Sequence, residues 1–270
     1  MPDFKVADSE FDRQASILEI LVKTIDVSSL QDALAPTLVA GAALPLVPAG
    51  GKNTMAAAAI VLLAAHFEEY VRQQVEEYAK SVIVEYAFLK SEFKDKLIDT
   101  YWRSGSGKLS RIKPKGFPGW AGLAEPVLHA LIDYPIGTNM LSFQAKLVSE
   151  HENNMRFDTM AELCGRVGIT KLGELMHKSK PLRDALNTPS KDQFNITLQR
   201  RVSEFYELRN GIVHSISQNA GVGSTVFNQW AVFFRHLTTA FSGALDDAFQ
   251  KFNKEIEKAK HDAAASAGAG

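Results

Sequence analysis

One short run of the chain, Arg209-Asn210-Gly211-Ile212-Val213-His214, combines side chains that can do chemistry on a phosphate group. Imidazole titrates near neutral pH and can move a proton, and a planar guanidinium can bind two phosphoryl oxygens at once. Asn210 and His214 are four residues apart, so in a helix they share a face, and Arg209 lies on the adjoining face. These three residues are the candidate catalytic group.

Arg209 occupies an unusual position in the helix that we predict around it. At about 100° per residue, it falls in the middle of the face formed by the apolar side chains. An arginine keeps its charge, so burying it without a partner is costly. We therefore expect Arg209 to face a cleft or interface that contains a carboxylate, carbonyl groups or an anionic ligand. The apolar residues on this face are Leu198, Val202, Phe205, Tyr206, Ile212, Val213 and Ile216.

The elements that position this run are predicted to be helices, because no segment shows a convincing strand-like alternation. Ser9 is the expected cap of a first helix, which a proline-broken connection over 28–51 follows. The longest helix is expected from Met55 to about Trp102, with a break near Ser81 or Ser91. Further helices are predicted over residues 123–134, 159–167, 171–177, 191–216 and 225–260, and the tail 261–270 is predicted to be disordered.

The composition excludes several other classes of protein. The 270 residues are 46% hydrophobic and 23% charged, which is ordinary for a globular chain. The net charge of −1 excludes a general basic field, so any nucleic-acid contact must come from a local patch. The single cysteine, Cys164, is expected in the core, and together with a polar N-terminus it favours the cytoplasm. The apolar stretches 33–49 and 55–65 are interpreted as buried packing rather than membrane segments, because the first contains prolines and the second is short.

The spacing Arg-Asn-x-x-x-His near the end of a helix, with a loop and one more helix after it, resembles the signature of HEPN ribonucleases. Leu208, just before the arginine, is also typical of that signature. The stretch His151 to Ile169 resembles the segment that precedes the signature in the RiboL-PSP subgroup. The helix around His66–Arg72 resembles the leading helix of that subgroup, in which an acidic residue, here Glu68 or Glu69, often faces the motif.

The resemblance covers about residues 54–258 and implies an all-α, antiparallel helical bundle of HEPN type with an N-terminal helical extension. We divide the chain into an N-terminal helix and linker over 1–53, a HEPN-like domain over 54–260 and the tail. The first helix is expected either to brace its own domain or to bind a partner.

The resemblance also implies a mechanism. Family members typically form homodimers in which two motifs face one cleft around a single scissile phosphate. His214 is then the base for a ribose 2′-hydroxyl or the acid for the leaving 5′-oxygen, and Arg209 stabilises the phosphoryl charge. Asn210 orients the imidazole or holds a phosphate oxygen, and Glu68 or Glu69 either orients Arg209 or forms a structural salt bridge with it. No metal or other cofactor is expected.

Two groups of basic residues are candidate RNA contacts. The segment from Arg103 to Trp120 is predicted to be a glycine- and proline-rich loop without acidic residues, and its aromatic neighbours suit single-stranded RNA. An ordinary solvated loop explains it equally well. The second group lies on the motif helix, where ordinary surface charge is the alternative. The candidates are Lys108, Arg111, Lys113 and Lys115 in the segment, and Arg200 and Arg201 on the helix.

The leading hypothesis is therefore a metal-independent endoribonuclease in a bacterial toxin–antitoxin or anti-phage role, with an antitoxin or defence-system partner as a further expectation. The alternative is a catalytically silent HEPN module that binds RNA or a partner protein. A toxin controlled by nucleotidylation is disfavoured, because the tyrosine that such a toxin carries two residues after the histidine is here Ile216. The remaining hypothesis is a helical protein with a purely structural role.

Overall fold

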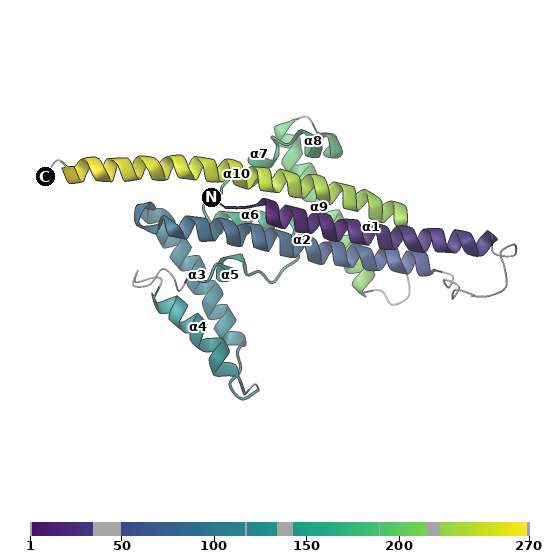
Figure 1. Ribbon diagram of the computed structural model, residues 1–270, viewed down its shortest axis with the longest axis horizontal. Coiled ribbons are helices and arrows are strands. Elements are labelled where there is room, and N and C mark those ends of the chain that lie inside the picture. Colours follow the sequence, from purple (N-terminus) through teal and green to yellow (C-terminus); the bar gives the residue numbers. More distant parts are fainter. Residues whose placement is uncertain are drawn as a thin grey trace.

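The computed structural model describes residues 2–34, 50–116, 118–133, 143–188, 190–214 and 222–268. Within these ranges the regular elements are helices and there is no strand, which confirms the all-α prediction. Three long helices lie side by side along the molecule: α1 (Lys5–Leu34), α2 (Gly51–Val84) and α10 (Ser224–Gly268) (Figure 1). The helix α1 runs in the opposite direction to α2 and α10, and α9 (Lys191–His214) packs against α2.

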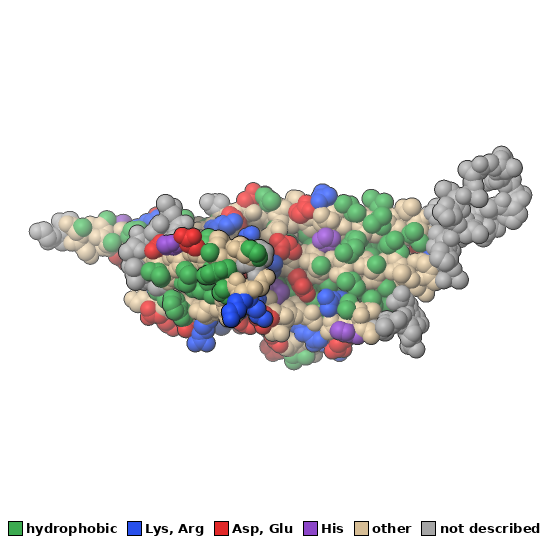
Figure 2. Space-filling view, turned by 90° about the horizontal axis from the view of Figure 1, so that it is seen from below, with side chains coloured by type: hydrophobic (Ala, Val, Ile, Leu, Met, Phe, Trp, Pro, Cys, Tyr) green, Lys and Arg blue, Asp and Glu red, His purple; other side chains and the backbone are tan. Residues whose placement is uncertain are grey.

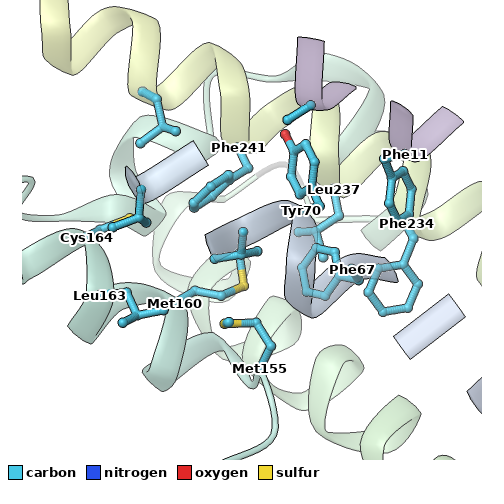
Figure 3. Packing of buried hydrophobic residues seen from close by; sticks show 14 of the residues in the cluster. Phe11, Phe67, Tyr70, Met155, Met160, Leu163, Cys164, Phe234, Leu237 and Phe241 are labelled. Carbon is cyan, nitrogen blue, oxygen red and sulfur yellow. The ribbon is translucent and has the colours of Figure 1, made fainter. Parts of the chain in front are cut away.

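Aromatic side chains join these helices in one core. Phe67 of α2 packs near both Phe11 of α1 and Phe234 of α10, with ring centroids 6.4 Å and 4.6 Å away (Figure 3). Phe205 of α9 contacts Phe234 at 4.4 Å. Burial of such large rings contributes roughly 2–3 kcal/mol each, so this cluster fixes α9 in the bundle. Cys164 is fully buried in the same core, as predicted.

The first helix braces its own bundle. The Asp8 carboxylate accepts hydrogen bonds from the Tyr70 hydroxyl at 2.7 Å and the Gln74 amide at 3.1 Å, both on α2. Ser9 is not the cap: α1 begins at Lys5, whose backbone N–H donates to the Asp3 carboxylate at 3.1 Å. The helix begins earlier because the Asp3 carboxylate caps it, and aspartate is as good an N-cap residue as serine.

The long helix predicted from Met55 breaks between Val84 and Ser91, around the short 3₁₀ turn η2 (Tyr86–Phe88). Although α2 is long and apolar enough to cross a membrane by length and composition alone, it packs against α1, α9 and α10 as a core helix. Gln74 and Glu76 are buried along it, which suits a protein interior with hydrogen-bonding partners.

The segment after the break differs from the prediction. Helix α3 (Ser91–Arg111) continues into the first half of the region expected to be a loop, and the described residues between Arg111 and Trp120 are not helical. It forms a projecting hairpin with α4 (Trp120–Asp133) (Figure 1). Gly105 accounts for the longer helix, because a glycine there leaves room for Leu131 of α4 to pack directly against α3. The glycine that indicated a loop is thus a contact point between two helices.

Short helices connect the hairpin to α9: α5 (Lys146–Ser149), α6 (Phe157–Arg166), α7 (Leu172–Met176) and α8 (Lys180–Leu186). The sequence indicates α6 and α7 but not α5 or α8. The tail is also corrected, since α10 remains helical to Gly268 and extends past the rest of the bundle (Figure 1). Its alanines, the strongest helix formers, continue the helix without packing. Residues 35–49 and Ile216 lie outside the described residues.

Candidate active site on the motif helix

The end of α9 positions Arg209 and Asn210. One turn earlier, Phe205 and Tyr206 are completely buried and anchor the helix. The Arg209 guanidinium donates to the Asn210 side-chain oxygen at 3.1 Å, and the Asn154 amide donates to the same oxygen at 3.4 Å. The loop between α5 and α6, which carries Asn154, is thereby joined to the motif.

Arg209 has no carboxylate within ion-pair distance among the described residues. Its Nε atom is shielded from solvent and also has no hydrogen-bond partner there. The structural salt bridge considered for it is absent, because Glu69 pairs instead with Arg72 at 3.1 Å and Glu68 lies near Tyr206. The half-buried guanidinium therefore keeps hydrogen-bonding capacity for an anion.

Tyr206 lies beneath this arrangement. Burial, followed by the neighbouring Glu68 carboxylate, raises the pKa of its phenol well above the usual value, so the phenol stays protonated at neutral pH. Its buried hydroxyl lies near Glu68 and the backbone of Met155 but forms no hydrogen bond of normal geometry with the described residues. The Tyr206 side chain of α9 thus lies next to Glu68 of α2.

A polar pocket of about 340 Å³ lies between α2 and the α5–α6 loop. Figure 2 shows acidic side chains gathered in this part of the molecule, beside the base of the projecting hairpin. The residues that line the pocket are Ala65, Glu68, Glu69, Arg72, Glu150 and His151. No group of three or more His, Cys, Asp or Glu side chains in the described ranges is arranged to hold a metal ion.

His151 is a pocket residue that the sequence did not single out. Its Nδ1 atom is 2.8 Å from the Asn153 carbonyl oxygen, whereas its Nε2 atom is shielded and has no partner among the described residues. The one sequence feature that could have indicated His151 is its position at the start of the segment that resembles the RiboL-PSP subgroup. However, the sequence alone does not show which side chains lie near a histidine in a loop.

His214 is the last described residue of α9, and its side chain is exposed. It lies five positions after Arg209, which corresponds to about 7.5 Å along a helix axis. Within the described part of the chain, nothing forms a hydrogen bond or ion pair with the imidazole. The structure therefore places His214 at the surface, at the end of the helix that carries Arg209, without fixing its orientation.

The predicted RNA contacts fall into two groups. Arg111, at the end of α3, pairs with Glu152 and lies 3.9 Å from Glu150, so the hairpin meets the rim of the pocket. Three lysines beside it, Lys108, Lys113 and Lys115, form no ion pair with the described residues.

On α9, the two arginines differ in how firmly they are held. Arg201 lies 3.9 Å from the centre of the Trp230 ring of α10 and pairs with Glu204 at 3.1 Å, so packing already occupies it. Arg200 is exposed and 3.7 Å from Glu204.

Residues 44–247 match the model of the family described as RiboL-PSP-HEPN. The matched region runs from just before α2 into α10 and includes both the Arg209–His214 run and the pocket. Comparisons with curated proteins and with solved structures give no match.

Proposed function

The chain belongs to the RiboL-PSP-HEPN family, and from this premise we propose that it is an endoribonuclease that cuts RNA without a metal ion. In this proposal Arg209 and His214 act on one scissile phosphate, and the ribose 2′-hydroxyl is the nucleophile. The products are a 2′,3′-cyclic phosphate and a 5′-hydroxyl.

One observation carries the proposal: the Arg209 guanidinium is half-buried and oriented but has no carboxylate partner in the described chain. A guanidinium in such a place gains most from an anionic ligand, because its charge is partly desolvated and most of its donors are not used by the described residues. A phosphodiester fits this requirement. Charge that grows on the phosphoryl oxygens in the transition state then strengthens the interaction.

The contacts of Asn210 favour one of the two roles expected for it. Its side-chain oxygen accepts from both Arg209 and Asn154, so we assign it to orienting the guanidinium rather than the imidazole. His214 is then left to transfer a proton as the RNA docks. Glu68 and Glu69 act indirectly, Glu68 beside Tyr206 and Glu69 by holding Arg72.

RNA approaches, in this proposal, along the α3–α4 hairpin, where Lys108, Lys113 and Lys115 supply positive charge without internal ion pairs in the described residues. Arg111 and Arg200 contribute less because both have acidic neighbours, and Arg201 mainly packs against α10. We further propose a homodimer with a composite active site, in the cytoplasm, with a toxin–antitoxin or anti-phage role.

The experiment is to incubate the purified protein with total RNA in EDTA, and to map the ends of any fragments. An Arg209→Ala/His214→Ala variant is the test, and Arg13→Ala is the control, because Arg13 is exposed on α1 and its one ion pair within the described ranges is with Glu10. Cleavage by wild type and by the control alone, with cyclic phosphate ends, supports the proposal. Intact RNA with folded wild-type protein contradicts it.

The exposed, unpartnered position of His214 in the described structure favours a second candidate, a silent module that binds RNA through Arg209 but does not cut it. That candidate predicts RNA binding that depends on Arg209, is unaffected by His214→Ala, and occurs without fragments.

A further inference from the structure

His151 is held in one orientation with one nitrogen unused. A carbonyl oxygen only accepts hydrogen bonds, so the 2.8 Å contact with Asn153 places a proton on Nδ1. In the neutral imidazole the lone pair is then on Nε2, which is shielded and has no partner among the described residues. A polar atom left in this state is unfavourable unless something that enters the pocket uses it.

The loop that carries His151 is fixed in place. The Arg166 guanidinium of α6 donates to the carbonyl oxygens of Val148 at 3.0 Å and Glu150 at 2.6 Å, directly before His151. Three residues after His151, Asn154 donates to Asn210 and so reaches the residue that orients Arg209. One short segment therefore supports both the histidine and the guanidinium.

The side chains that line the pocket with His151 are mostly acidic. Glu68, Glu69 and Glu150 line the pocket with His151, and Arg72 is the cation among them. Acidic groups therefore line the pocket that holds His151, whereas the phosphate is assigned to Arg209.

We propose that His151 is a second catalytic histidine and that the pocket receives the ribose whose 2′-hydroxyl attacks. Nε2 of His151 takes the proton from the 2′-hydroxyl as the 2′-oxygen forms its bond to phosphorus. The bond from phosphorus to the 5′-oxygen breaks, its electron pair stays on that oxygen, and protonated His214 supplies the proton. This assignment rests on the proposed function and divides the base and acid roles between two histidines of the chain.

The experiment compares His151→Gln, His214→Gln and a control, His129→Gln, in single-turnover cleavage. His129 is an exposed histidine of α4 whose nearest acidic group is Glu125, at 3.8 Å. The substrates are a short RNA and a ribonucleoside 3′-(4-nitrophenyl phosphate), whose leaving group departs without a proton. Removing a general base or acid slows cleavage about 10²-fold or more.

Loss of the base in His151→Gln slows both substrates and removes the rise in rate with pH on the acidic side of the profile. Loss of the acid in His214→Gln slows only the RNA, and His129→Gln matches wild type. A wild-type rate and pH profile in His151→Gln, with RNA cleavage lost in His214→Gln, overturns the role of His151 and leaves the proposed function standing. A wild-type protein that cuts neither substrate overturns both.

A thermal melt of each variant reports folding. If the melting temperature of His151→Gln is lower than that of wild type, His151→Ala is assayed with added imidazole and the nitrophenyl substrate. Restored cleavage supports the base role, and absence of rescue counts against it.

Discussion

At the scale of single residues, two arginines show what distinguishes a structural position from a functional one. Arg235 of α10 pairs with Glu19 and lies 3.6 Å from Asp12 of α1, so its charge is neutralised within the fold. Arg209 is half-buried on a packed helix without such a carboxylate in the described chain. Proteins retain unfavourable arrangements of this kind where function requires them.

Replacement by methionine, which keeps much of the volume, separates the two cases. Arg209→Met is expected to leave the free energy of unfolding unchanged or to raise it, because no ion pair is lost and an unpaired charge is removed. Arg235→Met is expected to lower it by about 1–2 kcal/mol, because Glu19 then loses a charged hydrogen bond. Urea denaturation measures both values, and a larger loss in Arg209→Met than in Arg235→Met would mean that Arg209 is structural.

At the scale of elements, the α3–α4 hairpin depends on one close approach. A side chain at Gly105 would place its Cβ 2.5 Å from the Cδ2 atom of Leu131, whereas nothing lies within 4 Å of the corresponding point at Gly107. Both glycines lie within α3, so the helix itself gains equally from alanine at either position.

Gly107→Ala is therefore expected to stabilise the protein by up to about 1 kcal/mol through helix propensity. Gly105→Ala is expected to destabilise it by about 1–3 kcal/mol, because buried Leu131 must shift. Thermal or urea unfolding of the pair tests this. Equal effects would show that the two helices do not pack as described.

The contact between α1 and α2 predicts a pH effect. Burial, the largest cause, raises the pKa of Asp8 in the folded protein above the ordinary value of 3.8. The folded state thus holds the Asp8 proton more tightly than the unfolded state, and its contribution to stability falls as pH rises from about 3.8 through the folded pKa. Asp8→Asn removes this loss, because an amide does not ionise. Its side-chain oxygen can still accept hydrogen bonds from Tyr70 and Gln74.

The variant should accordingly gain stability relative to wild type as pH increases from 4 to 7, as measured by urea unfolding at each pH. A difference that stays constant or shrinks over this range would contradict the assignment.

At the scale of the whole molecule, periodicity and motif spacing were enough to predict an all-α bundle and to identify Arg209 as misplaced on an apolar face. Both predictions depend on residues that are close together along one helix. His151 and the α3 extension depend on contacts between distant segments: Asn154 with Asn210, and Gly105 with Leu131. Composition cannot distinguish a glycine that ends a helix from one that admits a neighbouring helix.

The proposed composite site also predicts a solution property of the whole chain. Light scattering should give a molar mass near twice the 29.7 kDa of one chain. A monomer that nonetheless cleaves RNA would show that one protomer holds a complete site and would remove the composite arrangement from the proposal.

In the proposed reaction, Arg209 stabilises the attack of a ribose 2′-hydroxyl on the neighbouring phosphate. The most direct measurement is cleavage, in EDTA, of an RNA oligonucleotide whose cut site has been mapped, beside the same oligonucleotide with a single 2′-deoxynucleotide 5′ to that site. We predict that wild type cuts only the all-ribose strand and that Arg209→Lys, which keeps the charge but not the fork of donors, is about 10²–10³-fold slower. Cleavage of the deoxy-substituted strand at that site, or an unchanged rate in Arg209→Lys, would contradict this role of Arg209.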